Sequence, residues 1–147
     1  MPTAMPTSPP EAQTSRDQAS HARLLDEVRF DQGGLVACIA QQHDTGEVLM
    51  MAWMNRDAVA ETLATGRVCY WSRSRQALWR KGETSGQVQR LVDLRLDCDG
   101  DTLLALVDQH GVACHTGRRS CFYRAPRGAE LATLTAPEAD PKALYGR

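Results

Sequence analysis

The sequence predicts a strand-rich α+β domain with mixed β-sheets, one clear helix and short turns; an all-β fold with small helices is the alternative. Short apolar segments are separated by turn-forming residues, which is typical of strands, and one stretch carries a helix signal at both ends. At 147 residues, the chain can bury a single hydrophobic core. No apolar run approaches the roughly 18 residues of a membrane span, so an integral membrane protein is excluded.

The two ends of the chain differ in composition from its middle. Residues 1–23 are rich in Pro, Thr, Ser, Ala and Gln without an apolar period, which predicts a disordered leader, although a short helix over residues 21–28 could straddle its end. Residues 126–147 are similar and are expected to form a tail. The predicted folded unit is therefore residues 24–125. Since no basic segment followed by an apolar one begins the chain, we expect a cytoplasmic protein.

The folded unit is expected to open with a β-hairpin, Leu35–Gln41 and Val48–Trp53, around a turn at residues 43–46. A helix is predicted over Asn55–Thr65, because Asn55 is a favourable N-cap and Gly66 a favourable residue just after a helix end. Further strands are expected at Val68–Ser72, Val88–Leu96, Thr102–Val107 and, as a last short one, Cys121–Arg124.

Positive and negative side chains are segregated along this unit, although the formal net charge is only -1. Residues 67–90 carry six basic side chains and one acid, residues 93–108 carry five acids and one Arg, and residues 111–127 carry four Arg and no acid. This segregation indicates separate sites for anions and for cations. The small net charge argues against a protein that binds nucleic acid through bulk positive charge.

The run Asp97-Cys98-Asp99-Gly100-Asp101 places three carboxylates at alternate positions. In an extended segment they would point to one side, where a hard divalent ion such as Mg²⁺ would relieve their repulsion. A solvated acidic turn is one alternative. A calcium loop is another, but Gly100 stands at the wrong loop position and the flanking segments are predicted strands rather than helices.

Five cysteines, an odd number, in a protein expected in a reducing compartment argue against a disulfide framework. Cys38 and Cys69 lie in apolar strands and are expected to be buried fillers. Cys98, Cys114 and Cys121 lie in polar surroundings; they are ordinary cysteines, or three thiolates that hold Zn²⁺ and leave one position for water. Alternation turns Cys98 away from the carboxylates, and in a dimer it could join Cys114 and Cys121 of the neighbouring chain.

A polar segment from Ser72 to Gln87 shows no period and mixes hydroxyls, glycines and basic side chains, a combination that suits phosphate. A solvated basic loop is the alternative. If the segment binds phosphate, the candidate ligands are Arg73, Arg75, Arg80, Lys81 and Ser85. Further along, His115 adjoins a candidate zinc ligand and could be a fourth ligand or a proton shuttle.

Four stretches of the chain resemble the phosphoribosyl-AMP cyclohydrolase family, the histidine-biosynthesis enzymes that open the adenine ring of N1-(5-phosphoribosyl)-AMP. They are WSRSR (71–75), LWRKGETSG (78–86), DCDGD (97–101) and ACHTGRRSCFY (113–123). The similarity runs from about residue 34 to residue 123. The rival hypotheses are a non-catalytic zinc module that binds RNA or protein and a different purine or pteridine cyclohydrolase.

The resemblance implies an intertwined homodimer with Mg²⁺ at Asp97, Asp99 and Asp101, and with Zn²⁺ at Cys98, Cys114 and Cys121 shared between chains. It implies a hydrolase in which zinc-activated hydroxide attacks C6 and the N1–C6 bond breaks, giving the phosphoribosyl-formimino imidazole carboxamide ribotide. His115 would move the proton. The partners expected are this small-molecule substrate and a second copy, with neither nucleic acid nor membrane. The substrate phosphates would be held by Mg²⁺ and by the candidates Arg73, Arg75, Arg80, Lys81, Ser85, Arg118 and Arg119.

Overall fold

The computed structural model describes residues 11–140 and residue 142. The elements follow in chain order. They are α1 (Glu11–Glu27), β1 (Val36–Gln42), β2 (Val48–Met54), α2 (Arg56–Thr65), β3 (Cys69–Ser72), β4 (Ala77–Arg80), β5 (Gln89–Leu96), β6 (Thr102–Gln109), β7 (Arg124–Arg127) and β8 (Glu130–Thr133). The predicted strand-rich α+β class is confirmed.

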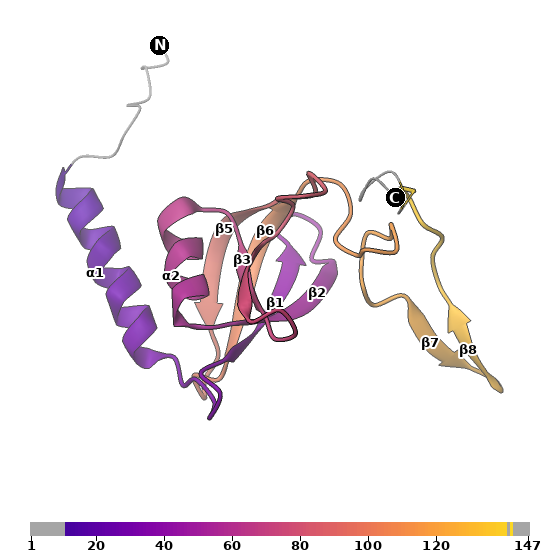
Figure 1. Ribbon diagram of the computed structural model, residues 1–147, viewed down its shortest axis with the longest axis horizontal. Helices are drawn as coiled ribbons and strands as arrows, with labels where there is room; N and C mark the ends of the chain where they lie inside the picture. Colours follow the sequence, from indigo (N-terminus) through magenta and orange to yellow (C-terminus); the bar gives the residue numbers. More distant parts are fainter. Residues whose placement is uncertain (1–10, 141, 143–147) are drawn as a thin grey trace, which may run out of the picture.

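A four-stranded mixed sheet with the strand order β2-β1-β6-β5 forms the centre of the fold (Figure 1). β1 pairs antiparallel with β2 and parallel with β6, while β6 pairs antiparallel with β5. Every second side chain of β1 and of β6 is buried, because one face of the sheet lies against the core. The predicted hairpin over residues 35–53 is confirmed, and its partner strand extends to Met54.

α2 begins and ends where the sequence predicted. The side chain of Asn55 accepts a hydrogen bond from the Ala58 N–H at 2.8 Å, which satisfies one of the free donors of the first turn. Gly66 has a φ of 74°, a left-handed conformation that ends the helix at little steric cost. The buried side chains of α2 include Val59 and Thr62, and α2 packs against β2 and β3. This packing places Glu61 of α2 within reach of β4.

The expectation of a disordered leader is wrong for residues 11–23, because α1 begins at Glu11. Residues 1–10 of that expected leader lie outside the described part of the chain. The helix is anchored at its C-terminal end, where Arg56 donates to the Leu25 carbonyl at 3.2 Å and pairs with Asp26 at 3.6 Å. α1 also packs against α2 (Figure 1). Neither α1 nor α2 is long and apolar enough to cross a membrane.

The segment from Ser72 to Gln87 contains a strand that its irregular composition concealed. β4 pairs antiparallel with β3, and Tyr70 lies opposite Trp79 with ring centroids 5.3 Å apart. Gln76, at a φ of 51°, stands in the tight turn between the two strands. Packing of Leu78 and Trp79 against the core therefore overrides the basic, polar character of the neighbouring residues.

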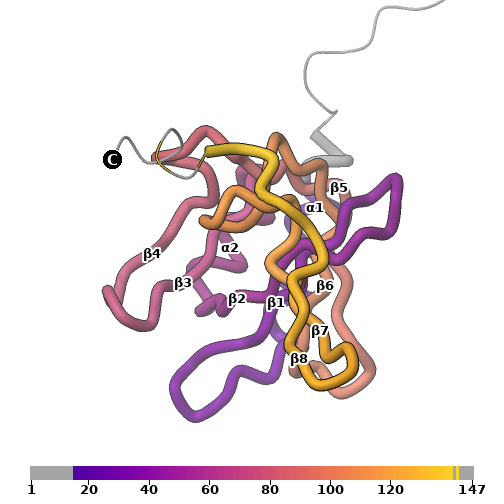
Figure 2. Tube along the Cα trace, turned by 90° about the vertical axis from the view of Figure 1, so that its right-hand side faces the viewer, coloured from indigo at the N-terminus to yellow at the C-terminus, as the bar shows by residue number. Residues whose placement is uncertain are grey.

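The last strand lies later than predicted. Residues 121–123 are not in a strand, and β7 and β8 form a hairpin within the segment expected to be a tail. Figure 1 shows this hairpin extending away from the main sheet, and in Figure 2, turned by 90°, the hairpin faces the viewer. Leu131, on β8, is 62% exposed. Residues 141 and 143–147 of the expected tail lie outside the described part.

Candidate functional site

The acidic turn between β5 and β6 brings three carboxylates together. One oxygen from each of Asp97, Asp99 and Asp101 lies within 4.8 Å of the other two, and all three side chains are exposed. The turn holds its shape because Asp97 Oδ1 accepts the N–H groups of Asp101 at 3.0 Å and Thr102 at 3.2 Å. These oxygens could hold a hard divalent cation.

The carboxylates of this turn affect one another. A hydrogen bond shared with Asp97 and the charge of Asp97 raise the pKa of Asp101. Desolvation acts to raise the pKa of Asp97, but hydrogen bonds from Asp101 and from nearby backbone N–H groups lower it overall. The pKa values of Asp97 and Asp101 are thus shifted in opposite directions, as expected for two acids that compete for one proton. A bound cation would remove this competition.

Cys114 and Cys121 lie side by side at the two ends of one loop. The loop is closed by hydrogen bonds from the Ala113 N–H to the Arg119 carbonyl at 3.0 Å and from the Cys114 N–H to the Arg118 carbonyl at 3.1 Å. Burial of the sulfur, followed by the neighbouring thiol of Cys114, raises the pKa of Cys121 to about 12. A metal ion that binds this pair must therefore displace thiol protons.

Four further hydrogen bonds fix this loop in place. The Cys121 N–H donates to the Leu49 carbonyl at 2.7 Å, which ties the loop to β2. The hydroxyl of Thr116 donates to the Cys114 sulfur at 3.0 Å. The carbonyl of Gly117 accepts from the N–H groups of residues 138 and 139 at 2.8 and 3.1 Å, so the last described part of the chain rests on the loop.

Cys98 does not join the thiol pair within one chain. Among the residues that the structure describes, the one group of three or more His, Cys, Asp or Glu side chains close enough to share an ion is the acidic trio. Cys98 is exposed, whereas Cys114 is 5% exposed. The expected buried fillers Cys38 and Cys69 are indeed in the core, at 0% and 1% exposure.

Lys81 is buried beside the thiol pair rather than exposed on the basic segment. It is 5% exposed, and its N–H donates to the Val68 carbonyl at 3.1 Å. Burial lowers the pKa of Lys81, while negative charge on Cys121 and Cys114 would raise it. Lys81 also lines two neighbouring cavities, so one residue both interacts with the thiols and borders the space a ligand could occupy.

The smaller of these cavities has a volume of about 260 Å³ and gathers three of the candidate anion ligands. Arg75, Lys81 and Ser85 all line it, together with Trp79. Arg75 is also held by the Ser72 hydroxyl, with Nε–Oγ at 3.4 Å. Another candidate, Arg73, lies elsewhere on the β3–β4 turn, with its guanidinium 5.1 Å from the ring centroid of Trp53.

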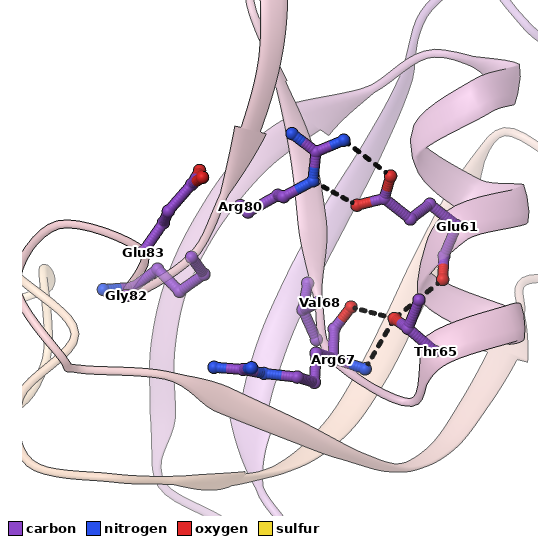
Figure 3. A pocket seen from close by; sticks show the side chains of 8 residues that line it. Glu61, Thr65, Arg67, Val68, Arg80, Gly82 and Glu83 are labelled. Carbon is purple, nitrogen blue, oxygen red and sulfur yellow. Dashed lines mark hydrogen bonds and ion pairs between the residues drawn. The ribbon is translucent and has the colours of Figure 1, made fainter.

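The larger cavity, of about 450 Å³, contains Arg80 paired with an acid (Figure 3). Arg80 Nε lies 2.8 Å from one carboxylate oxygen of Glu61, and Arg80 NH2 lies 2.9 Å from the other. The hydrogen bond from Arg80 is the main reason that the pKa of Glu61 is lowered. Sequence reasoning missed Glu61, since nothing in the chain links it with a residue 19 positions away.

Arg118 and Arg119 are both engaged within the chain. Arg118 Nε donates to the Thr135 carbonyl at 2.8 Å, and its guanidinium lies 4.1 Å from the Tyr123 ring centroid. Arg119 donates to the Gly111 carbonyl at 2.7 Å. Both arginines thus stabilise the loop from Cys114 to Cys121, which we call the cysteine loop. Their side chains contact carbonyl groups of this chain, and the expected contact with a substrate phosphate stays a prediction. His115, on the same loop, is exposed.

Sequence reasoning also missed a set of buried polar side chains beneath this loop. Gln42, Gln89 and Gln109 are each 4% exposed or less, and Tyr70 is fully buried. They lie on β1, β5, β6 and β3. An isolated glutamine in a strand carries no functional signal in the sequence, because it is usually a solvent-facing residue.

Comparison with known proteins gives a consistent result. Residues 50–123, which include all four motif stretches, match the family described as phosphoribosyl-AMP cyclohydrolase. A curated phosphoribosyl-AMP cyclohydrolase from Granulibacter bethesdensis is 71% identical over 124 residues, or 84% of this chain and 97% of the relative. One from Alkalilimnicola ehrlichii is 73% identical over 124 residues, covering 84% and 87%. One from Alcanivorax borkumensis is 63% identical over 137 residues, covering 93% and 96%.

Proposed function

The chain belongs to the phosphoribosyl-AMP cyclohydrolase family, hydrolases of histidine biosynthesis, and from this premise we propose how its own residues open the adenine ring of N1-(5-phosphoribosyl)-AMP. The observation that carries the proposal is the position of the Cys114–Cys121 pair beside Lys81, which also lines both cavities. Lys81 thus relates two soft ligands to a space of the size that a small-molecule substrate needs.

Zn²⁺ is the metal that fits the thiol pair. Thiolates are ligands that zinc prefers, and Cys114 and Cys121 supply two of the three required by a catalytic zinc with an open position. Cys98 of a second chain is proposed as the third ligand, because Cys98 does not approach the pair within its own chain. Zinc bound there would lower the pKa of a water molecule toward about 7.

A homodimer follows from this ligand set. Apart from Cys98, the support is the apolar surface that one chain leaves exposed near the cysteine loop and on the β7–β8 hairpin. Phe122 is 60% exposed, Leu131 62% and Leu134 49%. Exposed large apolar side chains on a projecting arm are typical of surfaces that a second copy covers.

Mg²⁺ is proposed for the acidic trio. Three clustered carboxylates suit a hard divalent ion, which also coordinates phosphate oxygens readily. The magnesium ion and the basic side chains around the smaller cavity would together hold the two phosphates of the substrate. Arg75, Lys81 and Ser85 are the first candidates, since they line one cavity. Arg73 is a further candidate from the same turn.

The reaction needs water to add across one ring bond. N1 of the substrate is alkylated, so the ring is cationic and C6 is electrophilic. The oxygen of water becomes the carboxamide oxygen, the N1–C6 bond breaks and a proton goes to N1. His115, next to Cys114 in the sequence and exposed, is our candidate for moving this proton. Phosphate contacts at both ends of the substrate would hold C6 at the thiol pair.

The direct test is an absorbance assay of ring opening with the purified protein and phosphoribosyl-AMP, with AMP as the matched control. AMP lacks the N1 substituent, so its ring is not cationic and it should not react. Turnover of phosphoribosyl-AMP that is lost with a zinc chelator and restored by Zn²⁺ supports the proposal. Full turnover by protein that contains no zinc would contradict the metal role, and no turnover of the metal-loaded protein would contradict the activity.

A further inference from the structure

A line of buried hydrogen bonds runs beneath the loop that carries Cys114. The Tyr70 hydroxyl donates to Gln89 Oε1 at 2.8 Å, and Gln89 Nε2 donates to Gln109 Oε1 at 2.8 Å. Tyr70 and Gln89 are 0% exposed and Gln109 is 4% exposed. Buried amides must find partners for every polar atom, so each bond in the line fixes which way the next amide points.

The line ends on the backbone of a turn. Gln109 Nε2 points at the carbonyl oxygens of His110 at 2.8 Å and Val112 at 3.3 Å. It also points at those of Gln87 and Val88, at 3.1 and 3.3 Å. One amide group therefore clips residues 110–112 to the start of β5. Had this amide pointed the other way, its oxygen would face four carbonyl oxygens.

The same turn is held from two further sides. Gln87 Oε1 accepts from the Val112 N–H at 2.7 Å, and Arg119 NH1 donates to the Gly111 carbonyl at 2.7 Å. Gly111 has a φ of 71°, and a Cβ built on it would collide with Gln87 Oε1. The turn thus occupies a conformation that needs glycine and leaves no room for movement toward Gln87.

We propose that Gln109 and Gln89 are positioning residues that hold the Cys114 thiol in place beside Cys121. Cys114 follows the clipped turn after a single residue, and its N–H is already committed to the Arg118 carbonyl. Loss of the hydrogen bonds that hold residues 110–112 would therefore remove the constraint on the N-terminal side of Cys114 and make its sulfur more mobile. That the thiol pair binds zinc rests on the proposed function. That Gln109 and Gln89 position the thiols does not depend on it. Loss of residues that orient metal ligands typically weakens metal binding by about 10–100-fold.

The test compares Gln109→Met with Gln41→Met in metal-free protein. Gln41 is a matched control, since its Nε2 also donates to a backbone carbonyl, that of Gly46 at 2.8 Å, but in the β1–β2 turn. Alkylation of each cysteine is followed by mass spectrometry of its peptide. Cys114 should react at least about 10-fold faster in Gln109→Met and unchanged in Gln41→Met. Core Cys38 reports global unfolding, so an equal acceleration of Cys38 and Cys114 would overturn the proposal.

Two further measurements cover the remaining outcomes. If Gln109→Met does not fold, Tyr70→Phe can replace it, because this variant removes a single oxygen from the start of the line. Alkylation of Cys114 should then become several-fold faster relative to that of Cys38. Equal rates of change at the two cysteines, or no change at either, would overturn the proposal. Zinc affinity, measured by chelator competition, should fall about 10–100-fold in Gln109→Met and stay constant in Gln41→Met. If the wild-type protein binds no zinc while Cys114 is still selectively released, the proposed function fails and the positioning role stands.

Discussion

Arg80 and Glu61 meet through two parallel contacts of 2.8 and 2.9 Å, although they lie on different elements, β4 and α2. The pair fastens the β3–β4 hairpin to the helix beside it. It also gives Arg80 a partner before any ligand binds. Among the basic candidates of this segment, Arg80 is therefore the one whose charge is already balanced within the described part of the chain.

Glu61→Gln should weaken the fold slightly at neutral pH and to a smaller extent in acid. Arg80 holds the pKa of Glu61 below its ordinary value. Such a carboxylate stabilises the fold above its unfolded pKa of about 4.3 and loses this effect as the pH falls through its lower folded pKa. Urea unfolding at pH 7 should show a small decrease in the midpoint for Glu61→Gln, and at pH 3 a smaller one. An equal decrease at both pH values would show that the charge of Glu61 is not the cause.

Cys114→Ala should lose zinc and turnover together, because the alanine removes one of the two thiols that lie side by side. Cys38→Ala is the matched control: it leaves a small cavity in the core and so costs some stability, but zinc content should remain. Metal analysis of the purified variants and the ring-opening assay check both statements. A zinc-free Cys114→Ala protein with full activity would remove zinc from the mechanism.

Mixing inactive Cys98→Ala chains with inactive Cys114→Ala chains should restore part of the activity. If Cys98 of one chain completes the thiol pair of the other, each mixed dimer contains one intact set of ligands. Random exchange of subunits would then return roughly a quarter of the wild-type activity, since half of the dimers would be mixed and each would have one working site of two. Activity that stays at zero after proven exchange would place all three ligands in one chain.

His115→Asn should retain zinc but slow the chemical step. The asparagine keeps a polar side chain of similar size but cannot exchange a proton near neutral pH, and a positioned acid–base group is typically worth about 10²–10⁴-fold in rate. The measurement is kcat together with zinc content. Loss of zinc in this variant would make His115 a ligand, and an unchanged kcat would make it a surface residue.

Asp99→Asn should abolish stabilisation by Mg²⁺ without harming the metal-free fold. Asp99 is preferable to Asp97 for this test, because Asp97 also accepts two backbone N–H groups that shape the turn. Removing one of three clustered negative charges reduces their repulsion, so the metal-free variant should be at least as stable as the wild type. Thermal unfolding with and without Mg²⁺ checks this. A Tm that still rises with Mg²⁺ in the variant would place the ion elsewhere.

Local signals in the sequence predicted the local structure well. Asn55 and Gly66 define both ends of α2, since each acts through hydrogen bonds within its own turn. The carboxylates of Asp97, Asp99 and Asp101 do cluster as expected, but the expected reason, alternation along an extended segment, is wrong, because a tight turn over these residues brings them together. In both cases the physical cause lies within a few residues of its effect.

Non-local relationships could not be predicted in this way. The parallel pairing of β1 with β6 joins segments more than 60 residues apart, and no periodicity encodes which strands become neighbours. β4 and the part of α1 before residue 21 were missed because packing of Trp79 and anchoring by Arg56 stabilise segments with weak intrinsic patterns, whereas the end of α1 agrees with the short helix considered over residues 21–28. Gln109 gave no signal, because its role depends on four carbonyl groups that only the folded chain brings together.

The contact of residues 138 and 139 with Gly117 has a practical consequence for handling the protein. A purification tag or a truncation at the C-terminal end would act on a segment that lies directly on the cysteine loop. An affinity handle is therefore better attached at the other end of the chain, before α1. Samples shortened after Thr135 should be compared with the full-length chain before their metal content is interpreted.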